Sequence, residues 1–545
     1  MHLTNVKFSY RVNDKKYTVN TAKTVENARV KLDISDTEDR FSAVISTKTP
    51  VEILCLEAEF DHTFPDDAKI FLNGYQSWTE CREYTVNDIQ KGVDHIPAPV
   101  RDKFSLAAYG DYTFTQYGRE KGCLHGFSYG YIRHGIGEYD LIGSLNEHDG
   151  FTVIRTDTTQ GKIIISKDCK GCEIKDTFGG LDIFFGRGEE NAVFDRYFEL
   201  MGIKAPSAKP VFGYTSWYRH YQDINHKKIS DDLEGLKTAP VRADIFQIDD
   251  GYQCAVGDWL RVDTSKFPDS MKAAADSITD AGLIPGIWLA PFVCEEKSEI
   301  YRTKKDWLLY DENGRPVKGG SNWSGFYALD IYNQEVRDYL KNVFDVVVNE
   351  WGFKLLKLDF LYAACIIPRR DKTRGMIMHE AMELLRGLAG DARILACGVP
   401  LASAFGIADY CRIGPDVSLE WNDKIYMQNL HRERPSTRNT VLCSAFRRHL
   451  SDRAFINDPD VFLLRDTDTT MTHPQKKCLA EINALCGGVL FSSDNFSEYG
   501  LWQDKELGEI EALRSARILS ADINGNILIV SVEKDGRYAI RTYHI

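Results

Sequence analysis

From residue 1 to about residue 200 the chain consists of short segments in which hydrophobic and polar residues alternate. Gly, Asn and Asp residues separate these segments, as expected for turns. Alternation with a period of two residues is typical of strands that bury one face. We therefore predict an N-terminal antiparallel β-sandwich over residues 1–204, with strands such as KLDIS at 31–35, FSAVIS at 41–46, VEILCLEAEF at 51–60 and KIIISKD at 162–168.

After the Pro-containing stretch KAPSAKP at 204–210 the pattern changes, and strand-like runs alternate with helical ones. Repeated strand-to-helix alternation over a segment of this length is typical of a (β/α)8 TIM barrel, which we predict over residues 205–503. A doubly wound sheet is the competing α/β fold, but it needs a glycine-rich first turn, which GYTSWY at 213–218 lacks. The predicted strands are VFGYTSWY (211–218), DIFQIDD (244–250), LIPGIWLAPF (283–292), FYALDI (326–331), LLKLDFL (355–361), RILACGVPL (393–401), DYCRIGPD (409–416) and AFINDPD (454–460).

The last residues, 504–545, return to a strand pattern. Asn524 and Gly525 lie between two such runs, and Asn-Gly favours a two-residue hairpin turn. A segment this short does not bury enough surface to fold alone. We therefore predict a short C-terminal β domain that packs on the barrel.

Composition excludes several classes of function. Lys and Arg number 67 against 80 Asp and Glu, and a net charge of −13 disfavours a nucleic-acid-binding protein. The N-terminus has no apolar run typical of a secretory signal, and no stretch approaches about 18 uninterrupted apolar residues, so we predict no membrane span. Thirteen scattered cysteines favour free thiols in a reducing compartment, which indicates the cytoplasm.

Acidic residues recur where the predicted barrel strands end. Asp249 and Asp250 end FQIDD, Asp359 lies in KLDF, and Asp416 ends RIGPD. In barrels of this kind the catalytic residues lie at the carboxyl ends of the strands. Asp is also common in turns and helix caps, and that is our interpretation of three further residues in similar places, Asp330, Asp458 and Asp460.

Lys357 and Asp359 differ from these because residues two apart on a strand share a face. Burial of two charged groups inside an apolar barrel destabilises the fold unless they form an ion pair, and such groups are otherwise retained for function. Two carboxylates from separate strands can cleave a glycosidic bond, and indole surfaces suit the apolar faces of sugar rings.

The motifs NGYQSW, GYTSWY, FQIDDGYQ with GDWL, GIWLAPF, KLDFLYA, ILACGVPL, RIGPDV and INDPD follow one another from about residue 73 to about residue 465. As an ordered set they resemble the motif series of glycoside hydrolase family 36, the bacterial alpha-galactosidases. The resemblance implies a retaining, exo-acting alpha-galactosidase that releases terminal alpha-linked galactose from oligosaccharides of the melibiose or raffinose type by double displacement.

The same resemblance implies roles for individual residues. Asp359 matches the nucleophile and Asp416 the general acid/base, so Asp416 would have to be protonated and Asp359 ionised before the first step. Asp249 and Asp250 match the pair that binds the 4- and 6-hydroxyls of galactose. The implied substrate-binding residues are Asp249, Asp250, Lys357, Arg412, Trp288, Trp217, Trp78 and Cys397.

Other activities stay open at this point. Departures from the family pattern, at Tyr75, Thr215, Val399 and Leu419–Glu420, surround the implied pocket and leave its sugar and aglycone preference open. Within the enzyme class the alternatives are an alpha-N-acetylgalactosaminidase and an alpha-galactosyl transferase. A non-catalytic sugar-binding protein is the least favoured, because both catalytic carboxylates are present. We expect no cofactor and no metal site, small galactosides as partners, and make no prediction of oligomeric state.

Overall fold

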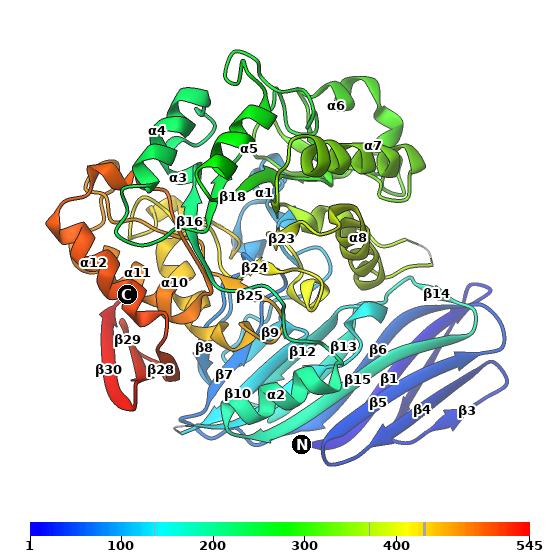
Figure 1. Ribbon diagram of the computed structural model, residues 1–545. Coiled ribbons are helices and arrows are strands. Elements are labelled where there is room, and N and C mark those ends of the chain that lie inside the picture. The colour runs from blue at the N-terminus through cyan, green and yellow to red at the C-terminus, as the bar shows by residue number, and fades with distance from the viewer. Residues whose placement is uncertain (136, 370, 429–431) are drawn as a thin grey trace.

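The computed structural model describes residues 1–135, 137–369, 371–428 and 432–545. Two antiparallel sheets form its N-terminal part (Figure 1). The first has the order β2-β1-β6-β13-β12-β9, with β14 beside β6, and consists of β1 His2–Val12, β2 Lys15–Thr21, β6 Val51–Asp61, β9 Cys123–Phe127, β12 Thr152–Asp157, β13 Lys162–Lys167 and β14 Glu173–Ile174. The second has the order β3-β4-β5-β15-β11-β10-β7-β8 and consists of β3 Val25–Glu26, β4 Val30–Asp36, β5 Arg40–Thr47, β7 Lys69–Leu72, β8 Glu83–Thr85, β10 Tyr129–His134, β11 Glu138–Ser144 and β15 Thr177–Gly188.

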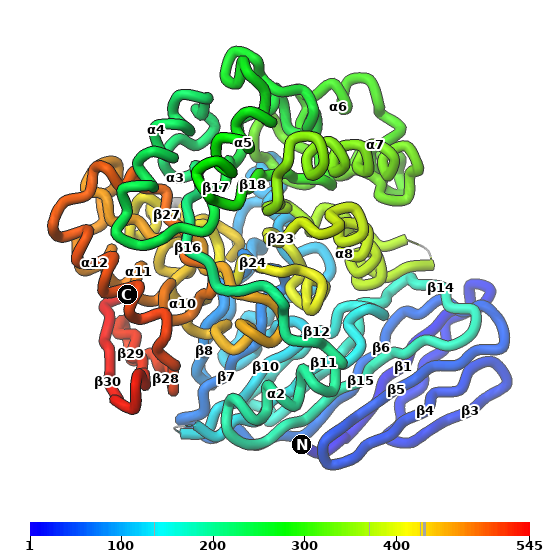
Figure 2. Tube along the Cα trace, viewed as in Figure 1, coloured from blue at the N-terminus to red at the C-terminus, as the bar shows by residue number. Residues whose placement is uncertain are grey.

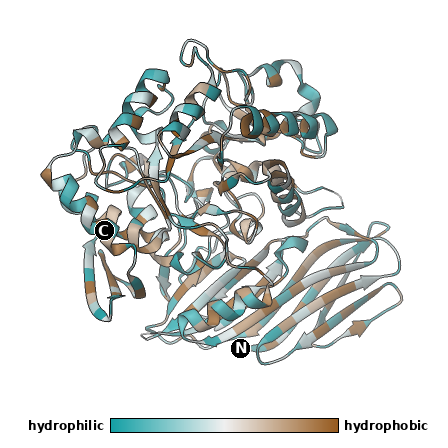
Figure 3. Cartoon of the chain, viewed as in Figure 1, coloured by the Kyte–Doolittle hydropathy of each residue, from teal (hydrophilic) through white to brown (hydrophobic). Residues whose placement is uncertain are grey.

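These two sheets share one hydrophobic core. In β5 every second side chain is buried, and Phe41 of that strand meets Phe60 of β6 edge to face, with ring centroids 5.2 Å apart. Hydrophobic and hydrophilic bands alternate along the strands in Figure 3. The prediction of antiparallel strands from the period-two pattern is therefore confirmed.

A curled parallel sheet forms the centre of the molecule. Its order is β25-β24-β23-β22-β18-β17-β16-β27-β26, and the pairs between neighbours within this run are parallel. Its strands are mostly apolar and mostly buried, as expected for parallel strands covered on both faces. They are β16 Val211–Thr215, β17 Ile245–Ile248, β18 Ile284–Leu289, β22 Leu355–Leu358, β23 Arg393–Ala396, β24 Tyr410–Arg412, β25 Ile456–Asp458, β26 Val461–Phe462 and β27 Val489–Ser492.

One predicted strand of this sheet is wrong. The run at 326–331 does not join it, because β21 (Phe326–Ala328) pairs antiparallel with β19 (Val293–Glu295) and β20 (Lys318–Gly320) in a separate small sheet. β18 instead pairs directly with β22, and the strand that the prediction missed is β27, which lies between β16 and β26. Both runs are short, apolar and buried, so periodicity does not distinguish them.

Helices follow most strands of the parallel sheet and surround it, as the tube in Figure 2 shows. α2 instead packs on β11 and β15 of the N-terminal sheets. The helices are α1 Ala98–Lys103, α2 Glu190–Leu200, α3 Trp217–His220, α4 His226–Leu236, α5 Met271–Asp280, α6 Glu299–Thr303, α7 Gln334–Asp345, α8 Arg374–Ala389, α9 Ile425–Gln428, α10 Thr437–Phe446, α11 His473–Cys486 and α12 Leu501–Leu513. Within the described ranges, no helix combines the length and the apolar character needed to cross a membrane.

At the C-terminus β28 (Arg517–Asn524), β29 (Ile527–Lys534) and β30 (Arg537–His544) form an antiparallel sheet. The predicted hairpin at Asn524–Gly525 is confirmed: Asn524 pairs with Ile527, and Gly525 has a φ of 59°. The sheet packs on α11, where the Tyr543 hydroxyl donates to Glu481 at 2.7 Å.

A buried arginine joins the N-terminal sheets to the parallel sheet. Arg447, at the end of α10, is fully buried, and its guanidinium donates to Asn73 Oδ1 at 2.9 Å and to the carbonyl oxygens of Ser77 and Ile413 at 2.8 Å each. The loop after β7, which carries Trp78, is thereby held against the end of β24.

Candidate active site

A pocket of about 400 Å³ opens at the carboxyl ends of the parallel strands. Of the ten residues singled out from the sequence, eight line it, while Cys397 and Arg412 lie directly behind its wall. The eight lining residues are Trp78, Trp217, Asp249, Asp250, Trp288, Lys357, Asp359 and Asp416. Residues from distant parts of the chain therefore meet in one place.

Asp249 and Asp250 reach the same pocket although neighbouring residues of a strand point to opposite faces. The reason is that β17 ends at Ile248, so both residues lie in the turn beyond it, before Gly251, whose φ is 123°. Asp249 Oδ2 accepts from Lys357 Nζ at 2.9 Å. Burial alone would lower the pKa of Lys357, but the carboxylate of Asp249 outweighs it and holds that pKa above its ordinary value.

Asp250 accepts hydrogen bonds from neutral donors rather than from a cation. Gln253 Nε2 lies 2.5 Å from its Oδ1, while Gln222 Nε2 and Trp323 Nε1 lie 2.8 and 2.9 Å from its Oδ2. Burial raises the pKa of Asp250, and these donors oppose that rise. Trp323 has a φ of 55°, a left-handed conformation that is uncommon for a bulky residue.

Asp359 lies at the base of the pocket, directly after β22, and is 8% exposed. The indole N–H of Trp288 donates to its Oδ2 at 3.0 Å, and the backbone N–H of Phe360 donates to its Oδ1 at 2.9 Å. Burial raises the pKa of Asp359 and the nearby Asp416 adds to this, whereas Lys357 opposes the rise. Its ionised form therefore depends on Lys357 and Trp288.

Asp416 follows β24 and is the more accessible of the two carboxylates, with 38% of its side chain exposed. Arg412 Nη1 lies 2.7 Å from its Oδ1. That arginine also contacts Asp458 at 3.2 Å and Asp460 at 2.9 Å. A half-buried carboxylate and a fully buried one thus line the same pocket.

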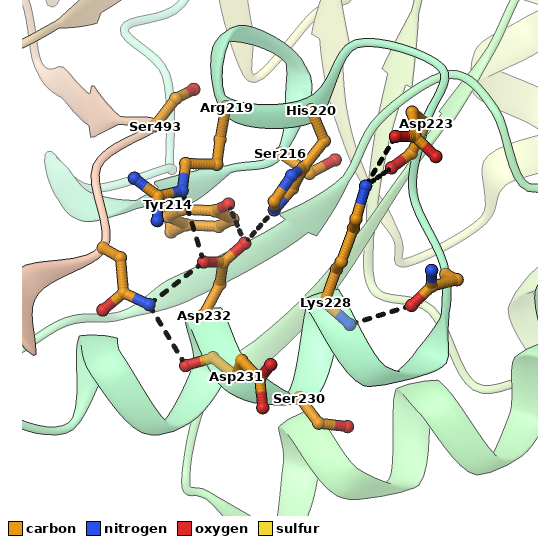
Figure 4. Close-up of polar contacts among 12 residues, drawn as sticks. Tyr214, Ser216, Arg219, His220, Asp223, Lys228, Ser230, Asp231, Asp232 and Ser493 are labelled. Atoms are coloured by element: carbon orange, nitrogen blue, oxygen red, sulfur yellow. Dashed lines mark hydrogen bonds and ion pairs between the residues drawn. The ribbon is translucent and has the colours of Figure 1, made fainter. Parts of the chain in front are cut away.

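Tryptophan side chains form much of the wall. Trp78 comes from the N-terminal part, and its Nε1 lies 3.2 Å from the Sγ of Cys397. Trp217 begins α3, which is held from behind by Asp232 of α4: the Tyr214 hydroxyl and His220 Nε2 lie 2.5 and 2.6 Å from its carboxylate (Figure 4). A rigid support of this kind fixes the position of the wall.

Sequence reasoning treated three carboxylates as turn residues. Asp330 agrees with that interpretation, since it accepts from the backbone N–H of Tyr332 at 2.9 Å and does not line the pocket. Asp458 also agrees with it, since its Oδ1 accepts from the backbone N–H of Asp460 at 2.9 Å, but Asp458 and Asp460 in addition lie buried against Arg412, which the sequence did not indicate. Trp323, one of the tryptophans that the sequence offers as a pocket wall, lines the pocket, but its hydrogen bond to Asp250 could not be read from the sequence.

The family model described as Melibiase matches residues 203–382. The chain is 23% identical over 298 residues to alpha-galactosidase Mel36A from Lactobacillus acidophilus, a match that covers 53% of this chain and 35% of the relative. The chain thus spans only about a third of the length of that curated relative.

Solved structures give longer matches. TtGalA, an alpha-galactosidase from Thermus thermophilus in complex with stachyose, is 26% identical with a TM-score of 0.72, over 90% of this chain and 99% of that one. The GH36 alpha-galactosidase AgaA from Geobacillus stearothermophilus, at 13% identity, shares the fold with a TM-score of 0.62, over 95% of this chain and 73% of its own. With the family model and the ordered motifs, these likenesses lead to one conclusion: the chain is similar to the alpha-galactosidases of glycoside hydrolase family 36.

Proposed function

We propose that the protein is a retaining, exo-acting alpha-galactosidase that releases terminal alpha-linked galactose from small galactosides. The observation that carries this proposal is the pairing of a buried carboxylate, Asp359, with an accessible one, Asp416, in a pocket walled by tryptophans. Relatives support the substrate class, since the Thermus thermophilus structures contain stachyose and p-nitrophenyl alpha-D-galactopyranoside.

The mechanism follows from the different surroundings of the two carboxylates. Asp359 attacks the anomeric carbon while Asp416 gives its proton to the leaving oxygen, so that a covalent galactosyl-enzyme forms and the aglycone departs. Water then gives a proton to Asp416, attacks the same carbon and releases Asp359. Lys357 and Trp288 keep Asp359 ionised in its buried position, as a nucleophile requires.

The Asp249–Asp250 turn supports recognition of galactose. Lys357 neutralises Asp249, while Asp250 has only neutral donors among the hydrogen bonds described above, so Asp250 is suited to accept from sugar hydroxyls. A polar group placed for an axial hydroxyl is left poorly paired by the wrong epimer, which discriminates strongly. We assign this pair to the 4- and 6-hydroxyls.

A hydroxyl at C2 is favoured over an acetamido group. The resemblance places Cys397 near the 2-position, and that side chain is fully buried. Trp78 closes the wall there: a Cβ on Gly398 would lie 2.9 Å from its ring. We infer that this close packing favours a hydroxyl over the bulkier acetamido group of an N-acetylgalactosaminidase substrate.

The parallel sheet supports a (β/α)8 barrel. β25 pairs with β24 and β26 pairs with β27, and only Pro459 and Asp460 separate β25 from β26. If β25 and β26 count as one interrupted strand, the described sheet has eight positions and closes on itself. We retain 1–204, 205–503 and 504–545 as domains, noting that α12 runs across the second boundary.

We also propose a cytoplasmic location. All thirteen cysteines fall within the described ranges and are free thiols. Ten of them are buried: Cys81, Cys169, Cys172, Cys294, Cys365, Cys397, Cys411, Cys443, Cys478 and Cys486. Free thiols are the usual state in a reducing compartment.

The test is hydrolysis of p-nitrophenyl alpha-galactoside, with the alpha-N-acetylgalactosaminide and the alpha-glucoside measured in parallel. We expect turnover of the galactoside and values lower by several decades for the other two. A preference for the acetamido sugar, or no turnover of any of the three, would refute the proposal.

A further inference from the structure

Among the described residues, Arg412 is the centre of a group of three carboxylates. Its guanidinium contacts Asp416 at 2.7 Å, Asp458 at 3.2 Å and Asp460 at 2.9 Å. Arg412, Asp458 and Asp460 are each about 2 to 3% exposed. The single positive charge of Arg412 does not balance three carboxylates, so the cluster has an excess of negative charge. Because the cluster is largely buried, this excess favours a proton on one of the carboxylates.

Asp460 is held more firmly than a turn residue needs to be. Its φ of 73° places it in the left-handed region, at the break between β25 and β26. Its Oδ2 accepts from the Tyr218 hydroxyl and, at 2.8 Å, from the backbone N–H of Val417. Its own N–H donates to Asp458 Oδ1 at 2.9 Å. Asp460 is therefore linked to Asp416 in two ways. Both carboxylates contact Arg412, and Asp460 also accepts from the backbone N–H of Val417, the residue that follows Asp416.

Several elements place titratable groups around this cluster. Burial raises the pKa of Asp460 to about 7, Asp416 and Asp458 add to the rise, and Arg412 and Lys357 oppose it. The groups that face the cluster are Lys357 and Asp359 of the β22 end, Cys397 after β23, Tyr218 of α3 and Tyr221 directly after it. Lys357 is already paired with Asp249, so Arg412 is the cation in direct contact with Asp416 among the described ion pairs.

An arginine that contacted Asp416 alone would be unfavourable for the first chemical step. A cation at 2.7 Å stabilises the carboxylate and makes it a poor proton donor. We propose that Asp460, assisted by Asp458, is a positioning residue that shares the charge of Arg412 and so keeps Asp416 able to give a proton to the leaving group. The inference rests on the proposed function, because it assumes that Asp416 is the acid.

The test is the pH dependence of kcat/KM for Asp460→Asn with melibiose, whose sugar leaving group needs protonation. Without the negative charge that Asp460 carries above about pH 7, Arg412 acts more strongly on the Asp416 carboxylate and favours its ionised form. The alkaline limb should move down by about one pH unit. With 2,4-dinitrophenyl alpha-galactoside, a substrate with a good leaving group, the limb should move much less.

Two further variants separate this role from a structural one. Asp460→Glu retains the charge, so its alkaline limb should stay near that of the wild type even if turnover falls. Asp330→Asn removes a carboxylate outside the pocket and should leave the profile unchanged. If Asp460→Asn does not fold, Asp458→Asn replaces it in the experiment. Its alkaline limb of kcat/KM should also move to lower pH.

An equal loss on both substrates without a shift of the limb would overturn the inference, and so would an upward shift. If the wild-type protein cleaves no alpha-galactoside at all, the proposed function fails instead. The two failures are thus distinguishable.

Discussion

Trp288 donates its indole N–H to Oδ2 of Asp359 over 3.0 Å, so that one side chain both forms a wall of the pocket and supports the charge of the proposed nucleophile. Burial raises the pKa of Asp359, and this hydrogen bond lowers it again. A change at Trp288 should therefore alter both the shape of the pocket and the pKa of Asp359.

We predict that Trp288→Phe moves the acid limb of kcat/KM to higher pH. Removal of the donor destabilises the ionised form of Asp359, so its pKa rises and a higher pH is needed to ionise it. A hydrogen bond to a charged group contributes about 1.5–3 kcal/mol, which corresponds to about one to two pH units.

The matched control is Trp307→Phe, because Trp307 also donates its indole N–H to a carboxylate, that of Glu335 at 3.0 Å, but away from the pocket. Its acid limb should coincide with that of the wild type. An unchanged limb in Trp288→Phe would contradict the proposed dependence.

Asp359→Asn retains the shape of the side chain but removes the attacking charge. Turnover should fall by about four decades or more, since only binding and proton transfer remain. Asp330→Asn, which removes a carboxylate that does not line the pocket, should stay near wild type. If Asp359→Asn retains more than about a tenth of the turnover, another residue is the nucleophile.

Asp416→Ala should affect poor leaving groups far more than activated aryl galactosides, because a good leaving group needs little protonation. Added azide should restore part of the activity and yield an α-galactosyl azide, because azide needs no deprotonation by Asp416 and attacks the β-linked galactosyl-enzyme in place of water. Product analysis by NMR checks this outcome. Equal damage to both kinds of substrate, with no azide product, would exclude Asp416 as the acid/base.

The stereochemistry of the first product tests the pair together. We expect the α-anomer of galactose in NMR spectra recorded during the first minutes of hydrolysis. We also expect carboxyl groups about 5–5.5 Å apart in a liganded crystal structure, the separation that suits direct attack. A β-anomer as first product would make the enzyme inverting and Asp359 a base.

Asp250→Asn should lower the efficiency on galactosides and narrow the gap between alpha-galactosides and alpha-glucosides. The Asp250 carboxylate accepts from Trp323 and Gln222, and we expect it to accept from a galactose hydroxyl as well. Ratios of kcat/KM for the two p-nitrophenyl substrates provide the measurement. Comparable cleavage of both epimers by the wild type would show that Asp250 does not select galactose.

The sequence by itself determined the classes of element and the main chemistry. Alternation along segments such as 41–46 specifies strands with one buried face, because side-chain direction in a strand depends only on local periodicity. The same local patterns show where each strand ends, and they therefore place four carboxylates at strand ends: Asp249, Asp250, Asp359 and Asp416. Parallel strands bring such ends to one edge of the sheet, and the pocket lies there.

Only the tertiary structure decided which short apolar run joins the parallel sheet, β21 or β27, because both satisfy the same local pattern and differ only in their neighbours. It also decided that Asp460 lies against Arg412. Asp460 is 48 positions from Arg412 in the sequence. The local sequence around an aspartate in a turn does not show whether the side chain faces water or a buried guanidinium. Contacts between distant segments carry this information, and local patterns do not.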